Sequence, residues 1–436
     1  MNNNKYFITD ADTMLNKKDQ LTNSSSNSDS NSSSSSNSSS SSSSNSSDSD
    51  KLYLEGHILN HYNIIYQIGK GGYSTVWLAC NINDHKFYAL KVHDHDDYDD
   101  SIDEVKFVKT LPTEPNCFNN IVEYFIKRIN NKKYICSIWN LHASNLDSII
   151  RKGNYNNGLP LNIVNNIMKQ LIKALDILHN KYKVFHGDIK PDNIFLKGIN
   201  QRDQYVINSY IKENFFEQYV NAKRDFWNKN NKNIKNIDKM KIDDKINIRT
   251  QVHSNIVKKI LANNEFKTIQ SNNIELTLEN SNISLGDFGT YCTKDNYYED
   301  SFGTRYYQAP EIILNGKTSY PVDIWALGCT YYELLSGKIL FDPTKDKNYS
   351  RDYYHLCLIT ETFGSFSSTF LKSTKKYKEF FNKKFILKDY SKPDICRLDR
   401  KLNESNLGYI KQFIIPMLKV DPKQRVTIKE LHNTLL

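Results

Sequence analysis

The segment HGDIKPDNIFL, residues 186–196, brings a carboxylate, a cation and an amide into close spacing. Asp188 could accept a proton from a hydroxyl nucleophile, and Lys190 could neutralise a group that gains negative charge. Asn193 offers an amide oxygen that could bind a metal ion. His186 fits packing and hydrogen bonding better than proton transfer. Together, these residue types in this order fit the transfer of a phosphoryl group.

A further candidate metal ligand lies downstream, in the tripeptide Asp287-Phe288-Gly289. The tripeptide alone is common in turns. Carboxylate and amide oxygens are hard ligands, which suit Mg²⁺ and its reluctance to lose water. With Asn193 and Asp287 as its ligands, the sequence predicts an Mg²⁺ site.

A glycine-rich run, IGKGGYSTV, lies near the start of the patterned sequence and fits G-x-G-x-x-S-x-V. Without a Cβ atom, glycine lets backbone amides approach phosphate oxygens closely. The pattern alone is weak, because glycine turns between strands are common. A strand rather than a helix follows the turn, which argues against a dinucleotide-binding fold. The candidate phosphate-binding residues are Ile68, Gly69, Lys70, Gly71, Gly72, Tyr73, Ser74, Thr75 and Val76.

A lysine on the next strand is a candidate phosphate ligand. Lys91 lies in the run KFYALKVH, and an inward orientation would need a carboxylate partner. Glu104 on the following helix is placed to supply it, and Asp103 is the rival. An exposed strand lysine is the commoner arrangement and stays an alternative.

The elements that must position these residues change character along the chain. Alternating apolar residues predict strands on both sides of the glycine turn, then a further strand, a helix and a strand pair. Apolar spacing in residues 162–182 then predicts a long amphipathic helix, and further helical stretches follow at 322–337 and 353–364. A small β-rich part followed by a larger helical part predicts an α+β, two-lobed domain over residues 62–436. Its two lobes would span about 62–139 and 143–436.

Two segments lie outside this pattern. Residues 23–50 contain only Ser, Asn and Asp, so we expect residues 1–50 to form a disordered tail. Residues 199–280 are rich in Asn, Lys, Asp and Ile, with few well-spaced apolar faces. We expect an insertion there, partly disordered, with a fragment of helix around residues 210–227. An independent domain is the weaker alternative.

Composition bounds the class of protein. The chain has 436 residues, a net charge of +9, seven scattered cysteines without a CxxC pair, and no apolar run long enough to span a membrane. The N-terminus is too polar for a secretory signal. We therefore expect a cytoplasmic or nuclear monomer. Only the net charge supports nucleic-acid binding, and no recognition motif does.

The order of these motifs, ending in Ala309-Pro310-Glu311, resembles the eukaryotic protein kinases. The resemblance implies ATP and Mg²⁺ as cofactors, with Lys91 on the α- and β-phosphates, Glu104 as its partner and Asp188 as the base. It also implies that Asp323 lies on a helix that anchors the catalytic loop. Arg425 would be the buried ion-pair partner of Glu311.

A narrower similarity is to the SR-protein kinases, which phosphorylate Ser in Arg/Ser-rich proteins. The run GYSTVWLA, the position of the insertion and the lack of Arg in the catalytic loop are all similar to theirs. Two residues depart from this pattern. Phe288 stands where those kinases usually have Leu, and Gln308 precedes Ala-Pro-Glu, which leaves the substrate preference open.

Two hypotheses follow: an active Mg²⁺·ATP-dependent serine/threonine protein kinase, and a catalytically inactive pseudokinase that acts as a binding scaffold. All the positions that carry phosphate, metal and base chemistry have competent side chains, which favours the enzyme. Gly187 stands where many kinases have an Arg that pairs with a phosphate on the activation segment. The sequence therefore predicts a kinase that is active without that phosphorylation.

Overall fold

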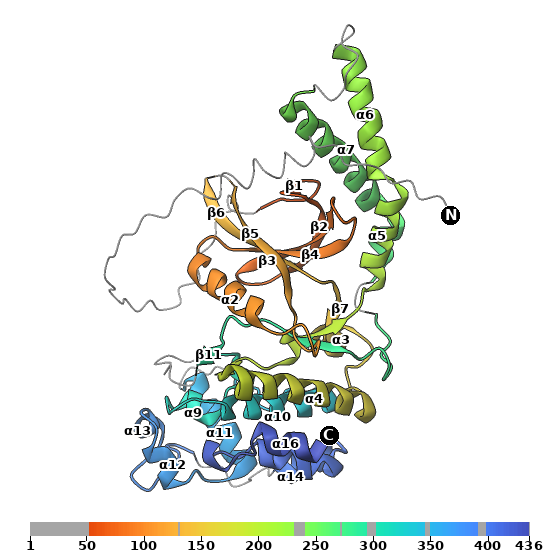
Figure 1. The fold of residues 1–436 in the computed structure, drawn as a ribbon. Helices are drawn as coiled ribbons and strands as arrows, with labels where there is room; N and C mark the ends of the chain where they lie inside the picture. Colours follow the sequence, from red (N-terminus) through yellow and green to blue (C-terminus); the bar gives the residue numbers. More distant parts are fainter. Residues whose placement is uncertain are drawn as a thin grey trace, which may run out of the picture. The chain divides into compact units, whose positions relative to one another are not determined.

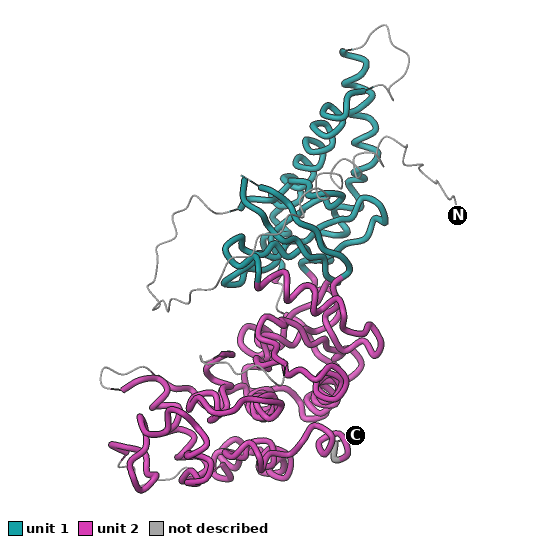
Figure 2. Tube along the Cα trace, turned by 60° about the vertical axis from the view of Figure 1, so that its left-hand side comes forward, with its two compact units in different colours: residues 1–99, 122–140, 202–269 teal, residues 100–121, 141–201, 270–436 magenta. Residues whose placement is uncertain are grey.

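The computed structural model describes residues 52–129, 131–230, 240–270, 273–293, 302–344, 349–390 and 398–435. The expected tail at residues 1–50 lies outside them. The chain forms two compact units (Figure 2). Unit 1 comprises residues 1–99, 122–140 and 202–269, and unit 2 comprises residues 100–121, 141–201 and 270–436. No helix among the described residues is long and apolar enough to cross a lipid bilayer.

Unit 1 is built on a six-stranded sheet with the strand order β1-β2-β3-β4-β6-β5 (Figure 1). Its core consists of apolar side chains that alternate along the central strands, including Ile64, Trp77, Leu90 and Ile138. Such alternation is what buries one side chain in two within a sheet. The strands are β1 (Ile58–Leu59), β2 (Tyr62–Lys70), β3 (Ser74–Asn81), β4 (Phe87–His93), β5 (Ile121–Ile129) and β6 (Lys132–Trp139).

Most of the segment expected to be an insertion is helical and packs with the sheet of unit 1. The sequence suggested only a fragment of helix here, whereas the structure has α5 (Gln201–Lys212), α6 (Phe215–Asn230), α7 (Ile242–Ala262) and α8 (Asn264–Thr268). Helices α6 and α7 lie side by side, as Figures 1 and 2 both show, and α7 contacts β2. The hydroxyl of Tyr66 on β2 also donates a hydrogen bond to the Asp203 carboxylate on α5.

The buried face of α7 explains why its helical pattern is hard to recognise. Ile248, Ile256 and Ile260 lie on this face, but Lys245, Arg249 and His253 are buried with them. Three polar residues in an otherwise apolar stripe weaken the periodicity on which helix prediction depends. The face is nevertheless compatible with burial where its polar groups are hydrogen-bonded.

His253 completes a buried hydrogen-bond chain between α7, α5 and β2. Asn63 Nδ2 donates to Tyr210 Oη over 3.0 Å, and Tyr210 Oη is 3.0 Å from His253 Nδ1. His253 Nε2 lies 2.8 Å from the carbonyl oxygen of Ile64. Every link has a matching donor if His253 carries its hydrogen on Nε2. Burial is the main reason why the pKa of His253 falls to about 4.

We expect this histidine to make unit 1 sensitive to acid. Because its folded-state pKa lies below the ordinary value of 6.5, the unfolded chain binds the proton first. The free energy of unfolding is therefore unaffected by protonation of this histidine above about pH 6.5. It decreases as the pH falls from about 6.5 to about 4, by about 3 kcal/mol in total. His253→Gln should flatten the pH dependence of urea unfolding in this range.

His93 and His355 are also buried with lowered pKa values, so the His253→Gln slope should fall without vanishing. His432→Gln, at a partly exposed position in unit 2, is the control and should leave the slope unchanged. An unaltered slope in His253→Gln would contradict this assignment.

Unit 2 is mainly helical and forms around α10 (Pro321–Ser336), in which every residue from Val322 to Ser336 is buried. A mainly apolar helix that is buried on all sides belongs in a core. It packs against α4 (Leu161–Asp176) and α15 (Lys411–Met417), and α16 (Ile428–Leu435) packs on α4. The other helices are α2 (Tyr98–Thr110, mostly in this unit), α3 (Leu146–Lys152), α9 (Pro310–Ile313), α11 (Arg351–Phe363), α12 (Ser368–Lys372), α13 (Tyr377–Phe380) and α14 (Leu398–Glu404).

Candidate active site

Two loops distant in sequence meet because the same strand pairs frame both of them. β8 (Val184–Phe185) pairs with β11 (Cys292–Thr293), and β9 (Ile194–Lys197) pairs with β10 (Ile283–Leu285) and β7 (His142–Asn145). The loop from residue 186 to 193 connects β8 to β9, and the loop from 286 to 291 connects β10 to β11. Antiparallel pairing at both ends therefore holds the two loops against each other.

Asp323 on α10 anchors the first loop, as the sequence predicted. Its carboxylate accepts hydrogen bonds from the backbone N–H groups of His186 at 2.8 Å and Gly187 at 2.9 Å. A third bond, 2.8 Å long, joins it to His179 Nε2. Burial alone would raise the pKa of Asp323, but these hydrogen bonds hold it below its ordinary value. The charged Asp323 carboxylate therefore fixes the backbone of the loop at His186 and Gly187.

Three neighbouring groups hold the Asp188 side chain. Lys190 Nζ lies 2.7 Å from Oδ2, and the backbone N–H of Thr304 donates to Oδ1 over 2.6 Å. Asn193 Nδ2 donates to the Asp188 carbonyl oxygen at 2.9 Å and lies 3.2 Å from Oδ2. The structure thus brings together three of the residues selected from the sequence. Asp188 itself is buried, with 9% of its surface exposed.

Thr304 is a site residue that the sequence analysis missed. Its Oγ1 is 2.5 Å from Lys190 Nζ, and its N–H binds Asp188, so one residue fixes both. The preceding Gly303 has a φ of 72°, and a Cβ there would lie 2.5 Å from the Gly187 carbonyl oxygen. The sequence contains only a Gly-Thr pair shortly before Ala309-Pro310-Glu311, which by itself does not identify the residue. We assign Thr304 as a positioning residue.

His186 links the two loops, in the packing and hydrogen-bonding role expected from the sequence. Its Nδ1 accepts the backbone N–H of Asp188 at 3.2 Å, and its Nε2 is 3.1 Å from the Gly286 carbonyl oxygen. These contacts require the tautomer that carries hydrogen on Nε2. The ring is completely buried, which leaves no path for proton exchange with a substrate.

The two candidate metal ligands are held near each other by the backbone. The N–H of Gly286, the residue before Asp287, donates to the Asn193 carbonyl oxygen over 3.0 Å. Because Asn193 Nδ2 is used by Asp188, its Oδ1 remains for a cation. Asp287 is exposed, and no described residue donates to its carboxylate. One amide oxygen and one carboxylate fit a hard divalent ion that keeps several waters.

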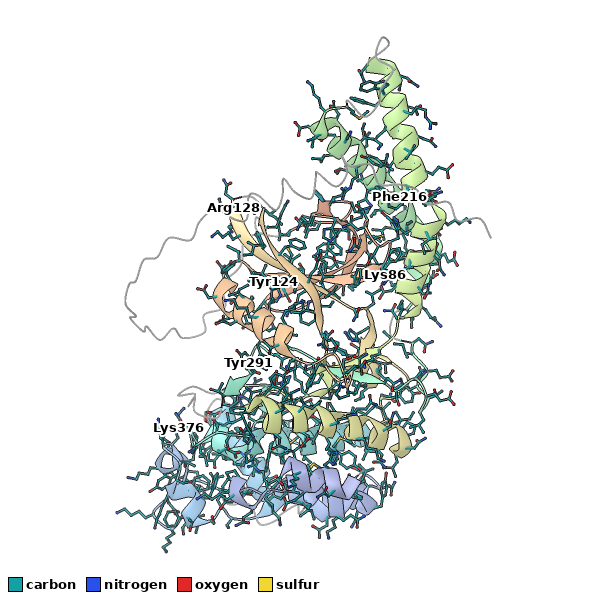
Figure 3. The ribbon with its side chains drawn as sticks, viewed as in Figure 1. Lys86, Tyr124, Arg128, Phe216, Tyr291 and Lys376 are labelled. Carbon is teal, nitrogen blue, oxygen red and sulfur yellow. The ribbon has the colours of Figure 1, made fainter. Side chains whose placement is uncertain are left out.

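Phe288 packs the loop that contains Asp287 against α2. Its ring is fully buried, 5.6 Å from Phe107 on α2, 6.1 Å from Phe118 and 4.9 Å from His186. Phe107 also stacks on Tyr291 at 3.9 Å; Tyr291 is labelled in Figure 3. This aromatic cluster fixes the conformation of Asp287, whose φ of 62° is uncommon for a residue with a side chain.

The glycine turn and Lys91 lie in unit 1. Residues 70–73 are exposed at the tip between β2 and β3, and Lys91 on β4 pairs in register with Val76 and Ser137. Glu104 is buried on α2 in unit 2. The predicted Lys91–Glu104 ion pair would join the two units and stays a prediction, as do the roles of the glycine-turn residues.

Gly187 has a structural reason to lack a side chain. Its φ is 83°, and a Cβ would lie 2.7 Å from the Thr290 carbonyl oxygen. A contact under 3 Å with backbone cannot be relieved by a rotamer change. This explains the departure at the centre of the catalytic loop independently of any regulatory role.

We expect Gly187→Ala to destabilise unit 2 by about 1–3 kcal/mol, through backbone strain and this contact. The matched control is Gly364→Ala, where φ is 86° but nothing lies within 4 Å of the added Cβ. The difference between the two variants in urea unfolding measures the cost of the close contacts of the new Cβ, with the Thr290 carbonyl oxygen at 2.7 Å and with the Phe302 ring at 3.2 Å. Equal losses would show that these contacts are relieved at no cost.

The predicted ion pair between Glu311 and Arg425 is confirmed. Arg425 Nη1 lies 2.5 Å from Glu311 Oε1 and Nη2 lies 2.6 Å from Oε2, with both side chains buried. The remaining donors bind the carbonyl oxygens of Lys419, Val420 and Pro321. All five guanidinium hydrogens are therefore used.

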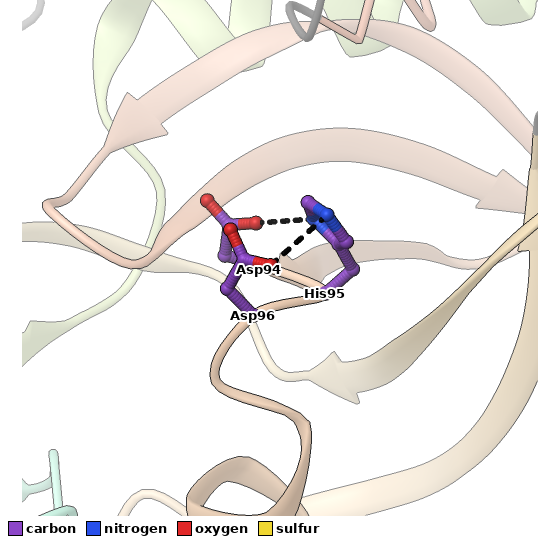
Figure 4. A group of neighbouring side chains, drawn as sticks. All are labelled: Asp94, His95 and Asp96. Atoms are coloured by element: carbon purple, nitrogen blue, oxygen red, sulfur yellow. Dashed lines mark hydrogen bonds and ion pairs between the residues drawn. The ribbon is translucent and has the colours of Figure 1, made fainter. Parts of the chain in front are cut away.

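Just before α2, within residues 94–97, one histidine contacts the aspartates on both sides of it (Figure 4). His95 Nδ1 lies 2.8 Å from an Asp94 carboxylate oxygen, and Nε2 lies 3.1 Å from Asp96. Three such ligand groups can hold a cation, but exposed acidic groups commonly occur together without one. Asp94 and Asp96 are exposed, so their carboxylates lie on a solvated segment.

Comparison with known proteins agrees with this geometry. The family model described as "Protein kinase domain" matches residues 62–212 and 265–435. A serine/threonine-protein kinase SRPK of Physarum polycephalum is 27% identical over 85% of this chain and 84% of its own. SRSF protein kinase 3 of Sus scrofa is 23% identical over 85% of each chain, and a putative serine/threonine-protein kinase of Acanthamoeba polyphaga mimivirus is 24% identical over 88% of each.

The similarity to SR-protein kinases and the α+β kinase fold expected from the sequence are thus confirmed. The family uses ATP with a divalent metal ion. In the loop from residue 186 to 193, the aspartate, the lysine and the asparagine are in hydrogen-bond contact, and this loop is joined to the Asp287 loop. The family model matches both loops, so the chain belongs to the protein kinase family, with serine/threonine specificity.

Proposed function

We propose that the chain transfers the γ-phosphoryl group of Mg²⁺·ATP to Ser or Thr hydroxyls in Arg/Ser-rich protein segments. The contact between Asp188, Lys190 and Thr304 is the observation that carries the proposal. Asp188 accepts the proton of the substrate hydroxyl, and Lys190 neutralises charge on the transferred group. Asn193 and Asp287 would hold Mg²⁺, which would supply positive charge to neutralise the phosphate oxygens.

The glycine turn supports the nucleotide part of the proposal. At Gly69, Gly71 and Gly72 an added Cβ would meet no atom closer than 3.5 Å, and none of the three has a positive φ. The fold itself therefore does not require glycine at these positions, unlike at Gly187 and Gly303. Access of a ligand to the backbone N–H groups is the remaining reason for three glycines in so short a turn.

Acidic groups beside the catalytic loop support a cationic substrate. The pKa of Asp192 is raised, mainly because its carboxyl group is partly buried and secondly because the negative charge of Asp147 lies nearby. Asp192 also keeps an exposed surface. Nearby, Arg151 binds both Asp147 and the buried Glu333. A substrate guanidinium next to Asp192 would relieve this excess of negative charge. The names of two relatives, SRPK and SRSF protein kinase 3, point the same way.

The test uses γ-labelled ATP and an Arg/Ser-repeat peptide, with versions in which Lys or Ala replaces Arg. We expect transfer to the Arg version, and in Asp192→Asn a KM about tenfold higher for that peptide with kcat little changed. Equal rates on all three peptides would refute the Arg/Ser preference. Absence of transfer by the unmodified chain across a broad peptide panel would favour a scaffold without catalysis.

We further propose that activity does not require phosphorylation of the activation segment. Gly187 has no side chain to pair with a phosphate, and Thr304 reaches Asp188 and Lys190 without one. Gln308 Nε2 donates to the Phe302 carbonyl oxygen at 2.9 Å and lies 3.3 Å from that of Gly303. Arg305 also pairs with Asp352 on α11. These contacts hold the described end of the segment from within the chain.

Treatment with a broad-specificity phosphatase should therefore leave the rate of peptide phosphorylation unchanged. Gln308→Ala should lower kcat, because Thr304 then loses the support of its neighbours. Loss of activity after phosphatase treatment, restored by autophosphorylation, would overturn the proposal.

A further inference from the structure

A lysine-rich surface lies on unit 2, between α11 and α14. Residues 365–390 contain seven lysines, two carboxylates and no arginine. Six of the lysines are exposed and the seventh, Lys376, is half-buried; Lys376 is labelled in Figure 3. The exposed ones are Lys372, Lys375, Lys378, Lys383, Lys384 and Lys388. A field of this sign attracts negatively charged ligands and raises their local concentration.

A pocket of about 100 Å³ opens within this surface. Its lining is mainly apolar and aromatic, from Phe366, Phe381, Phe385, Ile386 and Leu387 among others. An apolar cavity of about 150 Å³ accommodates benzene, so this one suits a single aliphatic side chain. Ile386, which lines the pocket, is 51% exposed.

Two further features indicate a binding site rather than a packing defect. Tyr390 lines the pocket, and its buried hydroxyl has no hydrogen-bond partner among the described residues. Phe385 has a φ of 60°, which is a strained conformation for an aromatic residue. Strain and unpaired polar groups gather at ligand-binding sites.

A tight hairpin maintains the strained residue and presents two lysines. Phe381 and Leu387 form an antiparallel bridge, and Asn382 Oδ1 accepts the N–H groups of Lys384 at 2.8 Å and Ile386 at 3.1 Å. Lys383 and Lys384 therefore stand exposed at the hairpin tip beside the pocket mouth.

The composition of the surface limits the classes of ligand that it can bind. Bidentate recognition of a phosphate group uses the fork of Arg, which residues 365–390 lack, whereas Lys acts as a compact point charge. A single-stranded nucleic acid would use exposed aromatic faces for base stacking, but Phe381 is buried and Phe385 is half-buried beneath Lys372 Nζ, 5.3 Å from its ring. A peptide with carboxylates around one apolar side chain fits both the positive charge of this surface and the apolar lining of its pocket.

We propose that this surface binds an Asp/Glu-rich segment of a separate protein, with one Leu or Ile side chain of that segment inserted into the pocket. The carboxylates lie over the lysines of the hairpin and of α12 and α13. The site does not depend on the proposed Arg/Ser specificity, and binding requires no phosphoryl transfer.

The test measures fluorescence anisotropy of a labelled peptide, with one Leu between runs of Asp and Glu, titrated with the full chain. We expect saturable binding that weakens as salt rises. Lys383→Glu with Lys384→Glu should raise Kd by about tenfold or more. Ile386→Ser, and separately Leu→Ser in the peptide, should each raise Kd several-fold without changing the salt dependence.

The matched control is Lys169→Glu with Lys429→Glu, two exposed lysines on α4 and α16 that give the same change in net charge. If peptide binding weakened equally in this control, the effect would come from the overall net charge, and the proposed site would be refuted. Asp188→Asn should bind the peptide normally, which separates this test from that of the kinase activity.

Two other occupants are distinguishable. If a poly(U) oligonucleotide binds more tightly than the peptide and is lost in the Lys383/Lys384 variant, the surface is a nucleic-acid site. If the peptide binds only after removal of residues 1–51, the chain's own N-terminal segment fills the surface. Either result would refute the proposal.

Discussion

Asp188→Asn should lower kcat for peptide phosphorylation by about 10²–10⁴-fold, because it removes the base while keeping the shape of the side chain. In this variant the Thr304 N–H keeps an acceptor only if the new amide turns its oxygen toward it, which directs the NH₂ group at Lys190. KM for ATP should change little, because Asp188 is not among the proposed nucleotide ligands. The measurement is steady-state transfer from labelled ATP.

The control for this prediction is Asp399→Asn, which changes the charge equally at a partly exposed pair with Lys411 in the same unit. Its kcat should match that of the unmodified chain. If Asp188→Asn retained more than about a tenth of the activity, base catalysis by this residue would be excluded.

Arg425→Met should lower the free energy of unfolding of unit 2 by about 3–5 kcal/mol, because it leaves the buried Glu311 carboxylate without its counter-charge. Three backbone carbonyl oxygens also lose a donor. Arg425→Lys should be costly too, since an ammonium group has three hydrogens for contacts that use five. Urea unfolding followed by near-ultraviolet circular dichroism measures both.

The exposed pair of Arg400 and Glu404, joined at 2.9 Å, is the control, and Arg400→Met should cost less than about 1 kcal/mol. The double variant Glu311→Leu, Arg425→Met should recover part of the loss, because no buried charge is left alone. If the double variant lost more free energy of unfolding than the two single variants lose together, the pair would contribute through packing rather than charge.

How much the sequence predicts depends on whether a residue acts through local pattern or through distant contacts. Asp188, Lys190 and Asn193 lie within one short segment, so their spacing in sequence already fixes their proximity. The anchoring by Asp323 could be inferred only through family resemblance, because its partners at His186 and Gly187 are far away in sequence.

Other features had no usable pattern. Thr304 reaches Asp188 from a different loop, and a Gly-Thr pair alone indicates nothing specific. Helix α7 hides Arg249 and His253 on its buried face, so its apolar stripe is interrupted. The surface at residues 365–390 reads as an ordinary lysine-rich stretch until Phe381 and Leu387 pair and close the hairpin.

The strand pairing beside the site has a consequence for how this chain can vary. Lys197 N–H donates to the Asn282 carbonyl oxygen at 2.9 Å, so the chain leaves β9 and returns to β10 through adjacent residues. Loop-closure entropy rises only with the logarithm of length, and the exit and return points stay fixed by β9 and β10. Length alone therefore costs little at this junction, but the segment between β9 and β10 also packs on β2, so a foreign domain grafted here would have to bury the same face of the sheet.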